Sequence, residues 1–212
     1  MKRLGALAIL VSLLIVIAAC NNPASDVNKA VTGEAQKAAS PATAGGQKYA
    51  ITPQNSKIDF IGSKVTGSHN GSFEKFNGEI HYTNNDPAQS HVQITIDTTS
   101  VKTDDPKLTE HLKTPDFFDV AKFPEAKFES TAIKAGGDKG ATHTITGNLT
   151  LHGVTKSITF PATIAVTADT ATVDANFAIN RKDFGINFAG ATDNLIRDDV
   201  VMKLTIRGNK AG

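Results

Sequence analysis

Apolar and polar side chains alternate along most of the chain after residue 57, and this alternation constrains the fold more than any other feature. A period of two is typical of β-strands that bury one face. The stretches that show it, some more weakly than others, are residues 58–60, 71–82, 92–96, 126–134, 142–151, 155–165, 173–179 and 200–206. The sequence therefore predicts an all-β domain of about eight strands that pair antiparallel, in chain order, in a closed barrel or a sandwich.

A His-Gly pair interrupts one of these alternations. Leu149 and Leu151 precede the pair, and the alternation resumes at Ile158. Gly153 supplies the backbone freedom that a tight reversal requires. His152 is therefore interpreted as a turn residue near the rim of a sheet rather than as a catalytic group.

One segment, around residues 104–120, does not follow the strand pattern. Asp105 followed by Pro106 is typical of a helix cap with a proline in the first turn. Leu108 and Leu112 then fall four residues apart, on one helical face. The sequence predicts a short helical excursion whose aromatic residues could either close the mouth of a barrel or simply fill the end of its core.

The apolar face of the strands is expected to point inward. The chain has no Trp, and the strands lack aromatic residues at both ends, which a lipid-facing barrel would carry. Eight strands enclose an interior that is either filled by side chains or wide enough for one slender, apolar ligand. Alternation alone does not choose between a ligand carrier and an interaction module with a filled core.

The amino terminus has the pattern of a secretory leader. Lys2 and Arg3 precede an apolar run over residues 4–19, which ends in two alanines before Cys20, the only cysteine. This arrangement resembles the bacterial lipobox, in which the cysteine is acylated and becomes the first mature residue. We therefore expect a lipoprotein signal peptide over residues 1–19 and a protein anchored through Cys20 to a membrane, on the periplasmic side of a bacterial cell envelope. An uncleaved anchor helix is the alternative.

Composition divides the rest of the chain into a tether and a domain. Residues 20–47 have few large apolar side chains, so we expect the acylated Cys20 to be followed by a flexible tether. The globular domain is then expected over residues 48–209.

Several functional classes lack support in the sequence. The formal net charge of +1 gives no reason to expect a nucleic-acid partner. Catalytic serine motifs, phosphate-binding glycine loops and catalytic cysteines are missing, so an enzyme is not expected. His69, His81 and His91 lie on neighbouring expected strands, but they show no ligand spacing, and no metal site is predicted.

Six short motifs resemble the YceI-like polyisoprenoid-binding family in their order and spacing. They are Gly71–Gly78, Ile96–Thr103, His111–Val120 continuing to Phe123-Pro124, Phe128–Thr131, Gly147–Lys156 and Arg181–Ile186. The resemblance covers nearly all of the domain. One departure is Asn55-Ser56, where the family often has a His-Ser pair.

The resemblance implies a lipocalin-like, eight-stranded antiparallel barrel with an elongated cavity for an isoprenoid chain, such as a polyprenyl phosphate or a quinone tail. It implies no cofactor, and it suggests a membrane-tethered carrier or sink for that lipid. A head group is expected at the mouth, where Arg181, Lys182 and Lys156 are candidates to pair with a phosphate. The side chains expected to line the cavity are Phe60, Phe73, Ile80, Val92, Ile94, Ile96, Phe117, Phe118, Phe128, Leu149, Leu151, Ile158, Phe160, Phe177, Ile179, Phe184, Met202 and Leu204.

Overall fold

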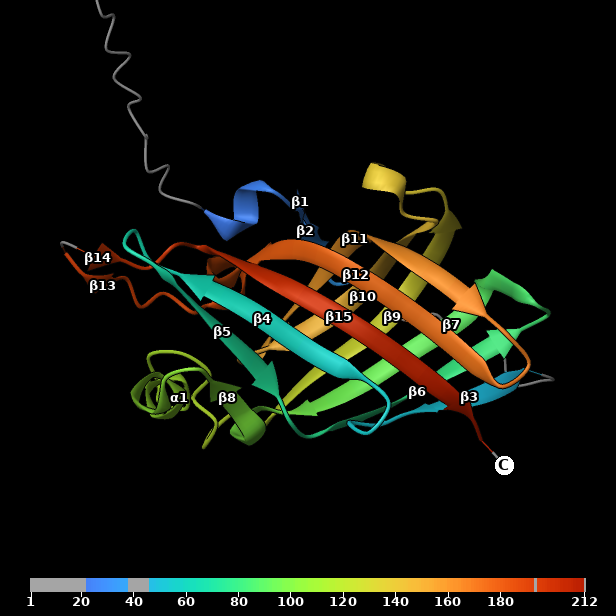
Figure 1. Cartoon of the computed structure of the whole chain (residues 1–212), viewed down its shortest axis with the longest axis horizontal. Helices are drawn as coiled ribbons and strands as arrows, with labels where there is room; N and C mark the ends of the chain where they lie inside the picture. Colours follow the sequence, from blue (N-terminus) through green and yellow to red (C-terminus); the bar gives the residue numbers. More distant parts are fainter. Residues whose placement is uncertain (1–21, 38–45, 193, 212) are drawn as a thin grey trace, which may run out of the picture.

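The strands pair, in the order of the chain, around a closed barrel (Figure 1). The computed structural model describes residues 22–37, 46–192 and 194–211. The expected signal peptide, the acylation site at Cys20 and part of the expected tether lie outside these residues. Within them, eight antiparallel strands form the barrel, which confirms the predicted fold class.

The first three strands of the barrel are each broken into two segments, whereas the other five are continuous. The broken strands consist of β3 with β4, β5 with β6, and β7 with β8. β15 closes the barrel, because it pairs with β12 on one side and with both β3 and β4 on the other. The segments are β3 Gln47–Ile51, β4 Lys57–Ser63, β5 Ser68–Phe73, β6 Phe76–Thr83, β7 Asp86–Asp97, β8 Val101–Thr103, β9 Glu125–Ala135, β10 His143–Leu151, β11 Val154–Val166, β12 Thr170–Asn180 and β15 Asp199–Lys210.

Local hydrogen bonds explain the breaks. Between β3 and β4 the Asn55 side chain accepts a hydrogen bond from the Thr52 amide at 2.8 Å and closes a turn. The expectation of one strand over residues 71–82 is wrong at Glu74 and Lys75, where the Lys75 amide instead donates to the Ser100 hydroxyl at 2.9 Å. The first two strands therefore bend, and their β4 and β5 halves extend one end of the barrel.

The turn between β10 and β11 confirms the interpretation of the His-Gly pair. Leu151 faces Val154 in the ladder, so His152 and Gly153 alone form the loop, with φ of 50° and 74°. Two consecutive positive φ values match the twist of a two-residue hairpin. A Cβ at Gly153 would also lie 2.4 Å from the ring of Phe123, so a larger residue does not fit there.

The predicted helical excursion is present, and it lies across the end of the barrel. After the 3₁₀ turn η2, Thr98–Ser100, and β8, helix α1 spans Pro106–Leu112. The Asp105 carboxylate caps it by accepting from the Lys107 amide at 2.8 Å. The chain then returns under the helix, where the Phe118 amide donates to the Leu112 carbonyl at 3.0 Å.

The N-terminal segment completes the barrel wall instead of forming a flexible tether. β11 and β12 pair with each other only over residues 163–166 and 171–174, and they diverge beyond those residues. β1, Asn28–Lys29, pairs with β12 in this gap, and β2, Val31–Glu34, pairs with β11 (Figure 1). The expectation of a tether is therefore wrong for residues 28–34. Backbone pairing overrode the polar composition of the segment.

A few short elements complete the described structure. They are the 3₁₀ turns η1 Pro23–Ser25, η3 Asp138–Gly140 and η4 Arg181–Phe184, and the two-stranded hairpin of β13 Gly190–Ala191 and β14 Asn194–Leu195. Over the residues that the structure describes, helices are too short or too polar to cross a membrane.

Candidate functional site

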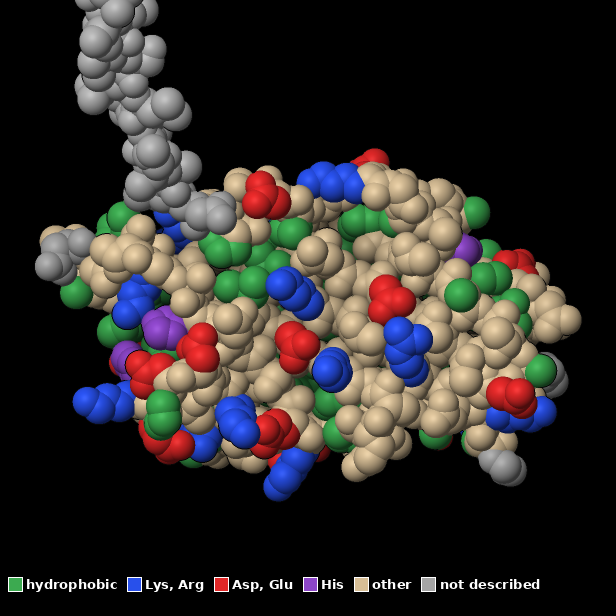
Figure 2. Space-filling model, in the orientation of Figure 1, with side chains coloured by type: hydrophobic (Ala, Val, Ile, Leu, Met, Phe, Trp, Pro, Cys, Tyr) green, Lys and Arg blue, Asp and Glu red, His purple; other side chains and the backbone are tan. Residues whose placement is uncertain are grey.

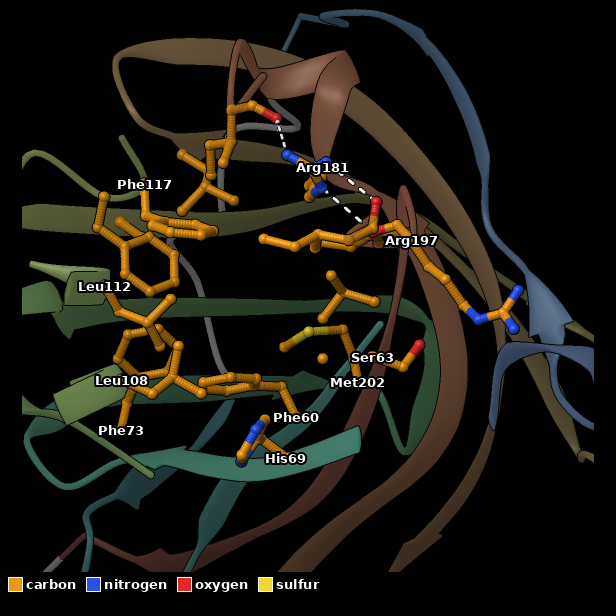
Figure 3. A pocket seen from close by; sticks show the side chains of 18 of the residues that line it. Phe60, Ser63, His69, Phe73, Leu108, Leu112, Phe117, Arg181, Arg197 and Met202 are labelled. Carbon is orange, nitrogen blue, oxygen red and sulfur yellow. Dashed lines mark hydrogen bonds between the residues drawn. The ribbon is translucent and has the colours of Figure 1, made fainter. Parts of the chain in front are cut away.

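An apolar cavity of about 150 Å³ lies at the end of the barrel that α1 covers (Figure 3). Strands form its floor, α1 and the chain after it form one wall, and Ile186, Ile196, Arg197 and Val200 form another. Half of the side chains expected to line a cavity do line this one. They are Phe60, Phe73, Ile96, Phe117, Phe118, Leu149, Leu151, Ile179 and Met202.

The other half lie outside the cavity lining. Most are core residues in the middle and at the far end of the barrel, where Phe160 stacks on Phe177 with ring centroids 4.1 Å apart and Phe128 lies 5.9 Å from Phe160. The expectation of one elongated cavity along the barrel is therefore wrong for these positions, because side chains fill the space. The residues are Ile80, Val92, Ile94, Phe128, Ile158, Phe160, Phe177, Phe184 and Leu204.

Aromatic rings form the wall under α1. Phe73 lies between Phe60 and Phe118, with ring centroids 5.7 Å and 5.5 Å away. Phe117 contacts both His111 and Phe188 at 5.0 Å and 5.5 Å. These rings make tilted or edge contacts rather than a close stack. Phe117 and Phe118 line the cavity as well as closing the end of the core.

Arg181 supplies a buried positive charge at the edge of the cavity. Only 4% of this residue is exposed. Its guanidinium donates to the backbone carbonyl of Ile186 at 2.7 Å and to that of Arg197 at 3.2 Å, and one Nη atom lies 3.4 Å from the Asp198 carboxylate. Burial lowers the pKa of Arg181, and the Asp198 charge opposes that shift. An arginine stays protonated in such a site, so a cation lies beside an apolar cavity.

The Arg181 guanidinium is shielded from water. Backbone carbonyls, which carry only partial charges, take the place of water around its guanidinium. Its one carboxylate partner, Asp198, is 42% exposed and also pairs with Lys182 at 3.0 Å. The positive charge of Arg181 is therefore incompletely neutralised.

The other two candidate cations lie outside the cavity lining. Lys182 is half-exposed and pairs with Asp198. Lys156 pairs with Glu34 of β2 at 2.7 Å, and this contact lowers the pKa of Glu34. Because Glu34 lies in the segment expected to be a tether, a partner for Lys156 was not predictable from the sequence.

Three polar residues line the cavity on the side of the β4–β5 hairpin. Ser63, Lys64 and His69 come from the β4–β5 hairpin. His69 lies 2.8 Å from the Asp104 carboxylate, which also accepts from the Asn70 amide at 2.9 Å. These hydrogen bonds lower the pKa of Asp104. The Arg197 guanidinium points away from the cavity, so its stem is the part that lines it (Figure 3).

Sequence reasoning missed several lining residues, and some of them carried a usable signal. Leu108 and Leu112 were expected on one face of a helix, and that face does point into the cavity. Ile186, Ile196 and the others lie in loops or at strand ends, where a period of two gives no orientation. The missed residues are Gly62, Ser63, Lys64, His69, Leu108, Leu112, Ala126, Ile186, Ile196, Arg197 and Val200.

Two of the three histidines considered as metal ligands face each other on the barrel wall. His81 and His91 are cross-strand partners; His81 lies 2.9 Å from Glu79, and His91 lies 3.5 Å from Glu129. Burial lowers the pKa of His91; the Glu129 charge opposes this shift, and His81 adds to it. Among the described residues, groups of three or more His, Cys, Asp or Glu are not arranged to hold a metal ion.

Known proteins are similar to this chain both in sequence and in fold. A UPF0312 protein of Pseudomonas putida strain W619 is 38% identical over 136 residues, which cover 61% of this chain and 70% of the relative. The crystal structure of Burkholderia cenocepacia BcnA is 26% identical, with a TM-score of 0.65, over 74% of this chain and 98% of that one.

A second solved structure has a similar fold at lower identity. It is described as a polyisoprenoid binding domain from Saccharophagus degradans, and it matches at 18% identity with a TM-score of 0.61, over 79% of this chain and all of that one. The family model described as the YceI-like domain matches residues 49–208, nearly the whole barrel, and leaves β1 and β2 outside the match. The chain therefore belongs to the family of YceI-like domains.

Proposed function

We propose that the barrel binds an isoprenoid lipid, with the chain in the apolar cavity and a polar head group near Arg181, and that it acts as a membrane-tethered carrier or sink. The observation that carries this proposal is a cavity with apolar walls next to a buried, incompletely neutralised cation. An apolar chain gains from such walls, and a phosphate gains from such a cation. The binding role that the Saccharophagus degradans domain carries in its description supports the same ligand class.

The size of the cavity limits how much of the lipid fits without rearrangement. An apolar cavity of about 150 Å³ accommodates benzene, so this one holds roughly one five-carbon isoprene unit. That unit gains about 4 kcal/mol relative to water, at about 0.8 kcal/mol per carbon. A longer chain requires the rings under α1 to rotate or α1 to lift from the barrel.

The lipid starts in a bilayer rather than in water, so the free energy of binding is measured relative to the bilayer, and the exchange remains reversible. A forty-carbon tail taken from water would gain on the order of 30 kcal/mol, beyond any non-covalent complex. Transfer from a membrane cancels most of that gain, because both environments are apolar. The head-group contact then decides which isoprenoids are preferred.

Blocking the cavity tests the proposal. Ala126 lines it, so Ala126→Leu should fill much of the space. Ala88→Leu adds the same side chain at an exposed position of β7 and is the matched control. Full-length acylated protein, extracted from membranes and analysed by native mass spectrometry, should carry isoprenoid in the wild type and in Ala88→Leu, and none in Ala126→Leu.

A specific observation favours a second candidate, a lipid-anchored interaction module. Most of the barrel interior is filled, and about 150 Å³ is small for a lipid carrier. In that case the wild-type protein would carry no isoprenoid and would take none up from vesicles that contain a polyprenyl phosphate. The same mass measurement therefore separates the two functions.

A further inference from the structure

Two exposed apolar side chains meet at the tips of neighbouring hairpins. Among the described residues, three large hydrophobic side chains are strongly exposed: Val31 at 71%, and Val65 and Leu195 at 48% each. Val31 lies on β2, on the barrel wall. Val65 lies in the turn between β4 and β5, and Leu195 ends β14.

Backbone hydrogen bonds hold these two tips together. The Val65 amide donates to the Leu195 carbonyl at 3.1 Å, and Lys64 bridges to Ile196 as in an antiparallel ladder. The Thr66 hydroxyl donates to the Asn194 side chain at 2.9 Å. The exposed pair is therefore a fixed feature of one surface, and it is named here the apolar tip, Val65 with Leu195.

The apolar tip adjoins residues that line the cavity. Ser63 and Lys64, just before Val65, line the cavity, and so do Ile196 and Arg197, just after Leu195. The described residues of both tips, 63–68 and 189–195, carry a single charged side chain, the cation Lys64; Asp193 lies outside the described residues. Figure 2 shows instead that acidic and basic side chains are interspersed over β4 and β15 on the barrel wall.

The first described residues, with η1, lie toward the same end of the barrel (Figure 1). Lys29 of β1 pairs at 2.7 Å with Asp199, which is four residues after Leu195. Cys20 precedes Asn22, the first described residue, by two positions, and two residues of chain span at most about 7 Å. An acyl anchor at Cys20 would therefore hold this wall and this end close to a bilayer.

We propose that the apolar tip docks on the membrane surface, with Val65 and Leu195 in the lipid interface and the cavity mouth against the bilayer. The occupant of this surface is a phospholipid bilayer, because the tip exposes two apolar side chains and lies beside the expected anchor. The inference rests on the proposed function for its biological use. An isoprenoid would then pass between bilayer and cavity without crossing water.

Site-specific quenching tests the docking. Because the native chain has one cysteine, which the anchor would occupy, a newly introduced cysteine is the only free thiol. Val65→Cys, Leu195→Cys and Ala168→Cys are labelled with a fluorophore in full-length acylated protein, in phosphatidylethanolamine and phosphatidylglycerol vesicles that contain a spin-labelled lipid. Ala168 is exposed at the far end, about 40 Å away by the length of the twelve-residue β15.

The labels at positions 65 and 195 should be strongly quenched and the label at position 168 unquenched. Equal quenching at all three positions, or none at 65 and 195, overturns the docking. A double variant, Val65→Ser with Leu195→Ser, separates the two proposals: it should slow uptake of a polyprenyl phosphate from vesicles but bind the same lipid normally in detergent. If wild-type protein does not bind the polyprenyl phosphate in detergent, the proposed function is contradicted, and the quenching result alone decides whether the tip docks on the membrane.

Discussion

Replacing Arg181 with methionine should separate recognition of the head group from recognition of the chain. Methionine keeps much of the length of the side chain and removes its charge and donors. Three backbone carbonyls, those of Ile186, Ile196 and Arg197, then lose a hydrogen bond. Leaving one buried carbonyl without a hydrogen bond costs about 1–3 kcal/mol. Removing the buried cation also removes the cost of its desolvation, which offsets part of the lost stability. We therefore expect a net loss in the free energy of unfolding of about 2 kcal/mol.

The effect on ligands should be selective. A hydrogen bond between a cation and a phosphate contributes about 1.5–3 kcal/mol, so a polyprenyl phosphate should bind about 10-fold to 150-fold more weakly. A neutral polyprenol should keep its affinity, because the apolar walls are unchanged. Urea unfolding gives the stability, and ligand titration in detergent below the unfolding transition gives both affinities.

The Lys182→Met variant is the matched control. Lys182 pairs with the same carboxylate, Asp198, but it is half-exposed, so its loss should change stability by less than about 1 kcal/mol. It should leave both ligands bound. The reasoning is refuted if Arg181→Met weakens both lipids equally, or if Lys182→Met discriminates between them as strongly.

Three further outcomes follow from the packing. Gly78→Ala should lower the free energy of unfolding, measured in urea, by about 1–3 kcal/mol, because its Cβ would lie 2.4 Å from a β7 carbonyl oxygen. Gly71→Ala should cost less, because the Phe60 ring that its Cβ meets can move into the cavity. Equal costs for the two variants would contradict this reasoning. Burial holds the pKa of His91 below 6.5, so the folded state binds fewer protons than the unfolded state and loses stability as pH falls through and below 6.5. His91→Gln should reduce this loss of stability, measured as the difference between urea midpoints at pH 8 and pH 5. An unchanged difference would exclude His91 as the source of the loss. Deleting residues 23–34 should speed hydrogen exchange at Ala178 and at those amides of β11 that point toward β2, with the β6–β7 hairpin unchanged. Unchanged exchange in β11 would mean that β2 does not close the gap between β11 and β12.

The strand pattern predicted the barrel well where the strands are long and continuous. β10, β11 and β12 bury every second residue over much of their length, so a period of two predicted their existence and their inner face, whereas the buried residues of β15 do not keep this period. The cap and proline before Leu108 likewise predicted α1. The breaks within the first strands followed from single contacts, such as Lys75 with Ser100, which periodicity does not encode.

The candidate site was predictable only in part. Alternation assigns Ile94 and Ile96 to the same inner face, but only Ile96 borders the cavity, because cavity depth depends on how side chains from opposite strands meet. Arg181 was expected near a head group, yet its burial depends on carbonyls of the loop that follows it. The partner of Lys156 depends on β2, whose polar composition gave no strand signal.

Because β1 and β2 are inserted between the diverging strands β11 and β12, part of the N-terminal segment is held in the barrel wall and could be released from it. Traction on the N-terminus would load these short ladders first, and they contain far fewer backbone pairs than the strands that close the barrel. We expect them to detach before the barrel unfolds. If the protein is anchored through Cys20 as proposed, the barrel would then lie farther from the membrane, with an opening in its wall between β11 and β12.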